Sequence, residues 1–174
     1  TQNPIEQEGT YTLPEAQVDR FMMKLKVDYP NKDEERQIIR SSARTEPIKI
    51  KKSKIKATAI TKAQQSINDI YVDEKVEEYI LNLVFCTRNP SNYNLPDLSH
   101  LIENGASPRA SISLILASKA RAFLEGRGYI TPEDVRFIGK DVLRHRIILS
   151  YEAEAEEISS EDIIQRLFDS IEIP

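Results

Sequence analysis

Apolar side chains recur at three- and four-residue steps along much of the chain, which is the spacing of one face of an α-helix. The clearest segment runs from Pro108 to Gly126: Ser107 can cap it, Pro108 suits its first turn and Gly126 can end it. We expect its inward face to carry Ile112, Ile115, Leu116, Phe123 and Leu124. This pattern predicts a long helix at the centre of a helical bundle.

Four shorter helices are predicted around it. One is capped by Thr61 and ends at Asp69, and a second covers 73–87. A third begins at the cap Thr131, and the last opens at Ser159 or Ser160. Their expected buried residues are Val76, Ile80, Leu83, Val84, Val135, Ile138, Val142, Ile163, Ile164, Leu167 and Phe168.

The first 44 residues have a weaker pattern. An amphipathic helix is expected over 13–25, a brief strand over 26–29 and a charged helix over 33–44. The apolar residues assigned to these helices are Val18, Phe21, Met22 and Leu25 in the first and Ile38 and Ile39 in the second. A short extended pair is also expected between 146–149 and 172–173.

Residues 45–60 differ from the segments on either side. Pro47 interrupts them, and their lysines alternate with a few apolar side chains. A basic groove for nucleic acid or an acidic peptide is one interpretation, but no aromatic residue is present for base stacking. We therefore predict a solvated linker between two lobes, and the net charge of −4 further disfavours a nucleic-acid-binding surface.

Composition narrows the class of protein. The chain has 174 residues, of which 40% are hydrophobic and 30% charged, so it is large enough to bury a core. No apolar stretch is long enough to span a membrane, and the first residues have no signal-peptide pattern. One cysteine and two histidines exclude an internal disulfide and offer no zinc-binding cluster, so we expect a cytoplasmic protein without a metal site. Because Thr1 is not a methionine, the chain is expected to be part of a longer protein.

Few residues have the chemistry of an active site. His145 lies between two arginines, which disfavour a proton-accepting base, and we interpret it as structural. His100 has no evident partner, and Cys86 is expected to fill a small space in the core.

Three other positions are candidates for phosphate chemistry. Arg109 lies in the first turn of the best helix, where the helix dipole disfavours a cation unless an anion or a neighbouring acid is present. Both explanations stay open. Arg20 follows Asp19 on the first predicted helix, where a rigid guanidinium could stabilise a transition state, although such pairs are usually surface features. Asn3, before Pro4, is either a turn residue or a polar group directed at a phosphate or a water.

Two motifs resemble the MoxR family of AAA+ ATPases. Thr1 to Tyr11 and Leu13 to Phe21, the latter reading LPEAQVDRF, are similar to that family from its sensor 1 strand onward. GASPRA at 105–110 resembles its sensor 2 segment, and the similarity continues through 126–135 and 142–147.

The resemblance implies a role for each candidate. Asn3 would be the sensor 1 residue that orients the attacking water, Arg20 the arginine finger that reaches a neighbouring subunit, and Arg109 the sensor 2 residue. It also implies use of ATP and Mg²⁺ by the intact protein, assembly into a homo-hexameric ring, and a chaperone-like role in remodelling partners, von Willebrand factor A domain proteins among them.

The motif GxxxxGK[ST], which holds nucleotide phosphates, is missing from the 174 residues, and none of the five glycines begins one. We therefore expect the chain alone neither to hydrolyse ATP nor to bind it tightly. The expected fold is mainly α-helical: a remnant of the AAA+ α/β core at 1–44, a linker at 45–60 and a helical lid at 61–174. The main alternative is a non-catalytic helical interaction module derived from such a lid.

Overall fold

The computed structural model describes residues 13–46 and 53–174, and it is mainly helical as expected. Asn3 lies outside the described residues. The elements in chain order are α1 (Glu15–Val18), α2 (Lys32–Ser42), α3 (Ala57–Asn68), α4 (Glu74–Arg88), two 3₁₀ turns (Pro90–Tyr93 and Pro96–Leu98), β1 (Ile102–Asn104), α5 (Pro108–Leu124), α6 (Pro132–Leu143), β2 (Ile148–Leu149), α7 (Tyr151–Ala155) and α8 (Ser160–Ser170).

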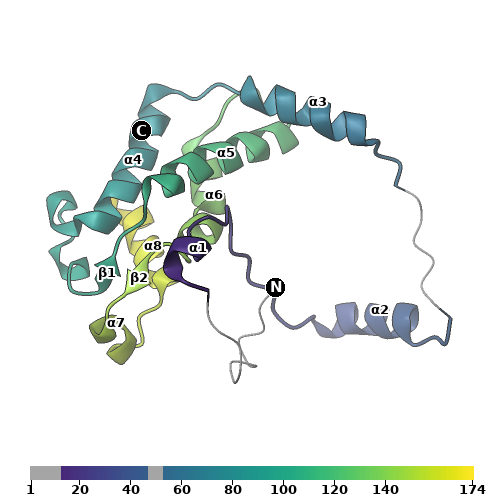
Figure 1. Ribbon diagram of the computed structural model, residues 1–174, viewed down its shortest axis with the longest axis horizontal. Helices are drawn as coiled ribbons and strands as arrows, with labels where there is room; N and C mark the ends of the chain where they lie inside the picture. The colour runs from purple at the N-terminus through teal and green to yellow at the C-terminus, as the bar shows by residue number, and fades with distance from the viewer. Residues whose placement is uncertain (1–12, 47–52) are drawn as a thin grey trace.

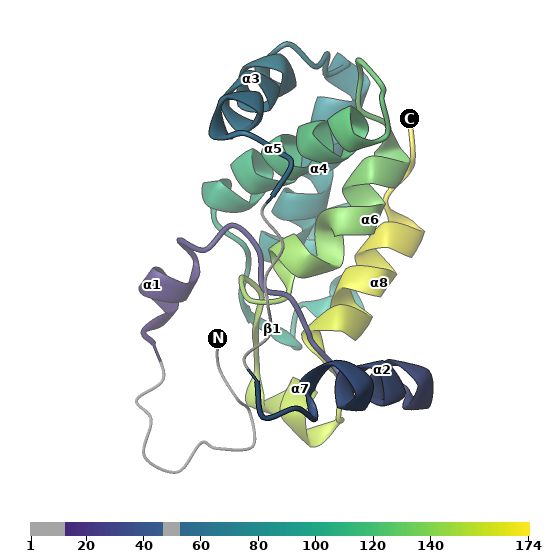
Figure 2. The same ribbon diagram turned by 90° about the vertical axis from the view of Figure 1, so that its right-hand side faces the viewer.

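Four helices, α4, α5, α6 and α8, enclose one hydrophobic core (Figures 1 and 2). Every residue predicted to be buried in α4, α6 and α8 is buried. Tyr79, Leu98 and Leu101 complete the core from α4 and from the segment before β1. The bundle formed by 70–171 therefore has the interior that the apolar pattern predicted.

The starts of the bundle helices follow from side-chain caps. Ser107 Oγ accepts a hydrogen bond from the backbone of Arg109 at 3.2 Å, and Asp73 caps α4 in the same way. Thr131 and Ser159 each form a capping box with the aspartate three residues later. These caps satisfy backbone amides that a helix leaves unpaired, and they confirm the predicted starts of α4, α5, α6 and α8.

A buried carboxylate joins α5 to α6. Asp134 accepts two hydrogen bonds from Arg127, at 2.6 and 2.8 Å, and one from Arg121 Nε at 3.1 Å. The Arg121 guanidinium also lies 3.4 Å from the centre of the Phe137 ring. Burial opposes ionisation of Asp134, but the hydrogen bonds from Arg127 and Thr131 outweigh it and lower the pKa of this carboxyl.

The predicted buried face of α5 was wrong in part. Ile112, Leu116 and Leu124 are 58%, 43% and 83% exposed, whereas Leu114 and several small residues face the core. The buried small residues are Ala110, Ser113, Ala117, Ser118 and Ala122. Small side chains let neighbouring helices approach α5 closely, and the pattern of large residues could not reveal this face.

Residues 13–46 differ most from expectation. The helix expected over 13–25 ends at Val18, and residues 26–29 form no strand. Phe21, Met22 and Leu25 are exposed rather than packed on a helix face, while Met23 contacts the core. The charged helix is confirmed as α2, held away from the bundle in Figure 1.

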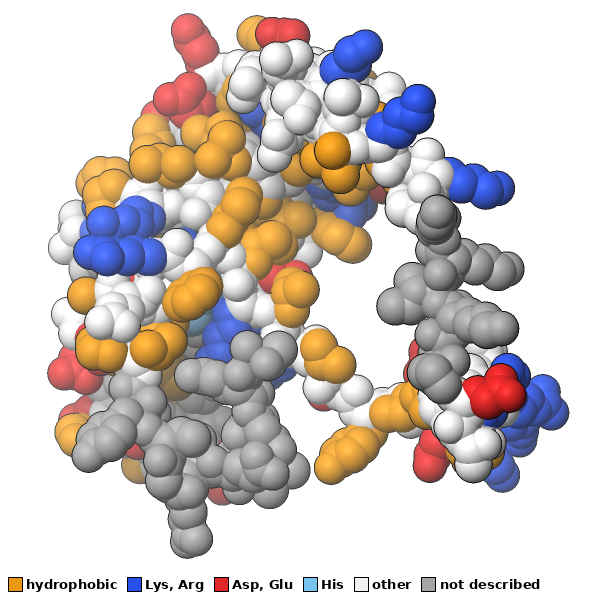
Figure 3. Space-filling model, turned by 45° about the vertical axis from the view of Figure 1, so that its right-hand side comes forward, with side chains coloured by type: hydrophobic (Ala, Val, Ile, Leu, Met, Phe, Trp, Pro, Cys, Tyr) orange, Lys and Arg blue, Asp and Glu red, His pale blue; other side chains and the backbone are white. Residues whose placement is uncertain are grey.

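The two apolar side chains expected to anchor α2 are exposed. Ile38 and Ile39 are 49% and 58% exposed, and α2 has no buried residue. Figure 3 shows apolar side chains on the side of the bundle that faces α2 across a hollow. Helix α2 therefore contributes no buried side chain to a core among the described residues.

Two local predictions also need correction. Helix α3 begins at Ala57, so Thr61 is not its cap and instead donates a hydrogen bond to the Ala57 carbonyl. β2 does extend near Ile148, but it pairs with β1 in an antiparallel ribbon and not with 172–173. Ser150, which donates its backbone N–H to Leu101, continues this ribbon.

Cys86 is buried in α4 as predicted, and burial raises its pKa to about 11, so it is an unreactive part of the core. Within 13–46 and 53–174, no helix has the length and apolar character needed to cross a bilayer. The same described ranges contain no group of three or more potential metal ligands.

Candidate functional site

Arg109 and Arg20 lie on separate segments that meet at Asp19. Arg109 is the second residue of α5, and Arg20 is in the turn that follows α1. The Arg109 guanidinium binds the Asp19 carboxylate, with NH1 3.0 Å from Oδ2. The neighbouring acid that sequence alone left open as a partner for Arg109 is therefore the residue next to Arg20.

Arg109 keeps much of its surface open to solvent. Its side chain is 56% exposed, and in the described residues only NH1 of its guanidinium is hydrogen-bonded. In the first turn of α5, Pro108 has no N–H, and the amides of Arg109 and Ala110 donate to Ser107, so the guanidinium is the available donor. A guanidinium at a helix N-terminus is a suitable arrangement for an anion such as a phosphate.

Asp19 is at the centre of the site. Besides Arg109 it accepts a hydrogen bond from the Ser107 hydroxyl, whose Oγ lies 2.8 and 3.0 Å from the two carboxylate oxygens, and from Arg146 Nε at 3.2 Å. Partial burial opposes ionisation, but the bonds from Ser107 and Arg109 and the charge of Arg146 lower the pKa of Asp19. Asp19 is thus an anion that orders two arginines.

Arg146 holds the backbone next to Asp19. Its side chain is 1% exposed. It donates to the carbonyls of Asp19, Phe21 and Met22 at 3.1, 2.6 and 3.1 Å, and to the Ser113 hydroxyl at 3.2 Å. Sequence analysis missed this residue, although a cation at the end of α6 is favoured by the helix dipole.

The neighbours of Arg146 extend this contact. Arg144 donates to the Lys24 carbonyl at 2.6 Å, and the Lys24 amide donates to the Asp141 carbonyl at 2.8 Å. Further along, Lys26 forms an ion pair with Glu161 at 2.8 Å. We call residues 19–26 the Arg20 segment, which is held along its length by the ends of α6 and α8.

Arg20 itself is exposed. It lies in a shallow pocket with Leu13, Gln17 and Phe21, and no hydrogen bond or ion pair engages its guanidinium in the part of the chain that the structure describes. The residues on both sides of it are fixed by Arg146. A guanidinium on an anchored backbone with a free end is suited to reach a charge on another molecule.

His145 is structural, as its position between two arginines predicted. Its Nε2 lies 2.9 Å from the Phe21 carbonyl, so Nε2 carries the proton, and its buried Nδ1 has no partner among the described residues. Burial lowers the pKa of His145, and Arg146 and Lys24 act in the same direction. The buried Nδ1 without a partner and the lowered pKa both favour the neutral form of the His145 ring.

This gives a prediction for stability against pH. Below the ordinary His pKa of 6.5, the unfolded chain takes up a proton that folded His145 resists. As the pH decreases below 6.5, the free energy of unfolding should therefore decrease until folded His145 itself takes up a proton. Above pH 6.5 the contribution of neutral His145 to the free energy of unfolding is fully present. Denaturant unfolding at about pH 7.5 and 5.5 measures the loss. His145→Gln, which can still donate to Phe21, should show a smaller loss, and an equal loss in both proteins would contradict the assignment.

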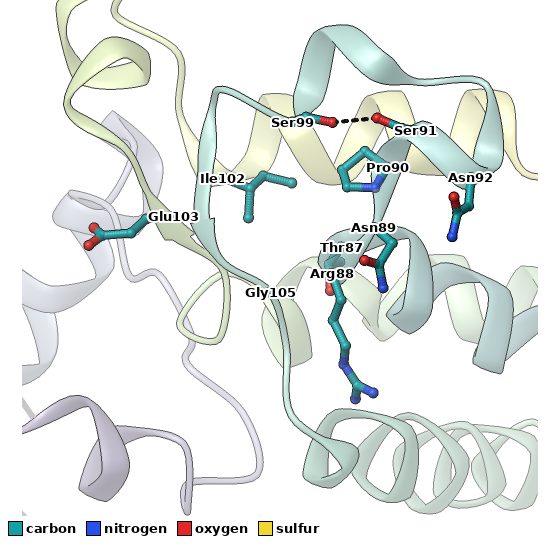
Figure 4. A pocket seen from close by; sticks show the side chains of 10 residues that line it. All are labelled: Thr87, Arg88, Asn89, Pro90, Ser91, Asn92, Ser99, Ile102, Glu103 and Gly105. Carbon is teal, nitrogen blue, oxygen red and sulfur yellow. Dashed lines mark hydrogen bonds between the residues drawn. The ribbon is translucent and has the colours of Figure 1, made fainter.

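A polar pocket of about 210 Å³ lies where the chain leaves α4 and returns toward α5 (Figure 4). Arg88 Nε donates to the Ala106 carbonyl at 2.7 Å, and Thr87 accepts from the Ala106 amide at 2.9 Å. A Cβ at Gly105 would lie 2.4 Å from the Thr87 carbonyl oxygen, so only glycine fits there without a shift. The close approach of Gly105 to the end of α4 fixes the direction in which the chain leads into α5, on which Arg109 lies.

Family models match two parts of the chain. The AAA lid domain model matches residues 98–167, and the model for the ATPase family associated with various cellular activities matches residues 1–23. The chain is 41% identical to Chaperone MoxR1 of Mycobacterium tuberculosis, over 100% of this chain and 46% of that protein. It is 29% identical to Protein MoxR of Methylorubrum extorquens, over 99% of this chain and 53% of that protein.

A solved structure shares the fold. The crystal structure of a candidate ATPase from Cytophaga hutchinsonii superposes with a TM-score of 0.93 at 43% identity, covering 99% of this chain and 52% of that one. The chain thus spans about half the length of the curated relatives it matches. The lid match includes α5, and the AAA match includes Asp19 and Arg20. These two matched parts meet where Arg109 binds Asp19. The chain therefore belongs to the MoxR family of AAA+ ATPases, of which it carries the lid domain and a short part of the ATPase domain.

Proposed function

We propose that this chain is the part of a MoxR-type ATPase that couples ATP binding and hydrolysis to the remodelling or assembly of partner proteins. One observation carries the proposal: an exposed arginine on an anchored turn, Arg20, and a solvent-accessible arginine at a helix N-terminus, Arg109, are joined through Asp19. Phosphate recognition uses such guanidinium groups, and the name of the relative Chaperone MoxR1 supports a chaperone-like role.

Each arginine has a separate task. Arg109, as the sensor 2 residue, binds the phosphates of ATP and reports their presence to the lid. Arg20, as the arginine finger, stabilises the charge that develops on the γ-phosphate held by a neighbouring subunit. Asn3, as the sensor 1 residue, orients the attacking water, and Mg²⁺ accompanies the nucleotide in the intact protein.

The remaining assignments complete the proposal. The intact protein works as a homo-hexameric ring in the cytoplasm, and its partners include proteins with von Willebrand factor A domains. Residues 1–44 belong to the α/β core, 45–60 form the linker, the last residues of which already belong to helix α3, and 61–174 form the lid. The family resemblance supports these points, and a finger that acts on a neighbour requires a head-to-tail contact between subunits, which forms a ring when it closes.

Arg109→Ala in the intact protein tests the sensor role. We expect ATP binding, measured by titration with a fluorescent nucleotide, to weaken by about tenfold to a hundredfold, the range for one lost hydrogen bond to a charged group. Arg166→Ala is the control, because Arg166 is also exposed and paired with one aspartate, Asp97. Unchanged affinity together with unchanged turnover in Arg109→Ala would refute the assignment and favour the non-catalytic interaction module.

A further inference from the structure

The last turn of α4 holds the backbone just before α5. Ala106 is fully buried, and both of its backbone groups are bonded there: its amide donates to Thr87 Oγ1 at 2.9 Å, and its carbonyl accepts from Arg88 Nε at 2.7 Å. Thr87 Oγ1 in turn donates to the Val84 carbonyl at 2.6 Å, so this hydroxyl is fixed within its own helix. Gly105 packs against the same turn, where a Cβ would lie 2.8 Å from the Arg88 Cα (Figure 4). We call Thr87 and Arg88 the Ala106 clamp.

The Arg88 side chain is itself held in place. Arg88 is the last residue of α4, where the helix dipole favours a cation. Its guanidinium carbon lies 4.8 Å from the centre of the Phe85 ring, one turn earlier on the same helix. Within 13–46 and 53–174 Arg88 forms no ion pair, and its side chain hydrogen-bonds to the Ala106 carbonyl. The side chain is therefore ordered for its contact with Ala106.

The path from Ala106 to Arg109 has little freedom. Pro108 restricts the residue before it to extended backbone, and Ser107 accordingly has φ −74° and ψ 169°. The ring of Pro108 also fixes its own φ at a value suited to the first turn of α5. Arg109 follows directly. Holding Ala106 at both of its backbone groups therefore fixes where the backbone of Arg109 lies.

We propose that Thr87 and Arg88 are positioning residues for phosphate binding at Arg109, and that they act by clamping Ala106 and thereby holding the start of α5. This rests on the proposed function of Arg109. A binding group that is already ordered loses less freedom when its ligand binds, so the clamp raises the affinity for nucleotide. Among the described residues neither clamp side chain bonds to Arg109, so its effect passes through the backbone.

Arg88→Met in the intact protein removes the donor to Ala106 but keeps the apolar stem of the side chain. We expect ATP affinity, measured by titration with a fluorescent nucleotide, to fall by about threefold to tenfold, the effect of having to order one side chain on binding. Unchanged affinity would overturn the proposal.

Arg136→Met is the matched control. Arg136 also donates to a backbone carbonyl, that of Phe168, and its guanidinium carbon lies 5.2 Å from the centre of the Phe168 ring. This contact joins α6 to α8 and not α4 to the start of α5. Arg136→Met should therefore leave ATP affinity within about twofold of wild type. A fall as large as that in Arg88→Met would overturn the proposal, because it would show a general effect of weakened packing.

A double-mutant cycle separates positioning from support of the fold. If Arg88 acts through Arg109, Arg88→Met should lower ATP affinity when Arg109 is present but change it by less than about twofold in the Arg109→Ala background. A residue that only supports the fold would have the same effect in both backgrounds. Equal losses of affinity with and without Arg109 would thus overturn the proposal.

Thr87 provides a second test that leaves Arg88 intact. Thr87→Val keeps the shape of the side chain but leaves the buried Ala106 amide without its acceptor, whereas Thr87→Ser keeps the hydroxyl. We expect Thr87→Val to weaken ATP binding at least as much as Arg88→Met does, and Thr87→Ser to stay within about twofold of wild type. Equal weakening in the two proteins would overturn the role of the Thr87 hydroxyl.

Arg109→Ala measured alone distinguishes a failure of the sensor role from a failure of the clamp. Unchanged ATP affinity in Arg109→Ala means that the proposed function of Arg109 is wrong, and the positioning role of Arg88 is then wrong with it. Weakened affinity in Arg109→Ala, together with a loss from Arg88→Met that adds to it in full, means that Arg109 binds nucleotide but the clamp does not position it.

Discussion

Replacing Arg20 by alanine in the intact protein is expected to lower ATP turnover by about three to five orders of magnitude, the usual contribution of an arginine finger. The physical reason is the position of the side chain. Arg20 is exposed and lacks a partner among the described residues, so its guanidinium is available to a neighbouring subunit. Because it stabilises charge that appears only in the transition state, nucleotide binding should stay within about twofold of wild type.

Steady-state turnover and nucleotide titration on the same preparations measure the two effects. Arg36→Ala is the matched control, since Arg36 is an exposed arginine on α2 that pairs with one acid, Asp33, among residues 13–46 and 53–174. Turnover of Arg20→Ala that equals that of the control would remove Arg20 from the mechanism. Parallel loss of binding and turnover would instead indicate a damaged fold.

Asp134→Ala is expected to produce the largest loss of stability. The side chain of Asp134 is 2% exposed and compensates Arg121 and Arg127, which are 26% and 27% exposed. Removing one member of a buried charge cluster leaves its partners uncompensated and typically costs about 3–5 kcal/mol. We expect about 3 kcal/mol, at the low end of that range, because both guanidinium groups keep some contact with water.

Asp162→Ala provides the control for helix capping. Asp162 occupies the same capping-box position in α8 as Asp134 does in α6, but it is exposed, and within the described part of the chain its side chain bonds to Ser159 alone. Urea unfolding of both variants therefore separates the cap from the ion cluster. A loss in Asp134→Ala no larger than in Asp162→Ala would mean that the arginines contribute nothing to the fold.

The starts of the bundle helices could be predicted because their causes are local. Ser107, Thr131 and Ser159 act within three residues of themselves, and the apolar residues predicted to be buried in α6 and α8 do face the core. In α5 the rule failed because Ala110, Ala117 and Ala122 are buried while Ile112 is exposed. Helix packing is decided by how closely backbones approach, and hydrophobicity alone does not report this.

The candidate site could be predicted only in part. Arg109 stood out because a cation in a first helical turn needs an anion, and the structure supplies one in Asp19. Arg146 could not be predicted, since its contact with Asp19 joins residues separated by 127 positions. Such a pairing depends on how the segment after α1 lies against α6, and the short α1 itself was expected to be a longer helix.

The most direct test of a finger that acts between subunits is complementation in mixed rings. Intact Arg20→Ala subunits are mixed with subunits that keep Arg20 but have a disabled P-loop, each inactive alone. If Arg20 acts on a neighbour, the mixture recovers turnover, because a disabled subunit supplies its finger to the intact pocket beside it. A mixture that stays as inactive as its two components, although mixed rings form, would contradict the assignment of Arg20 as a finger that acts on a neighbouring subunit.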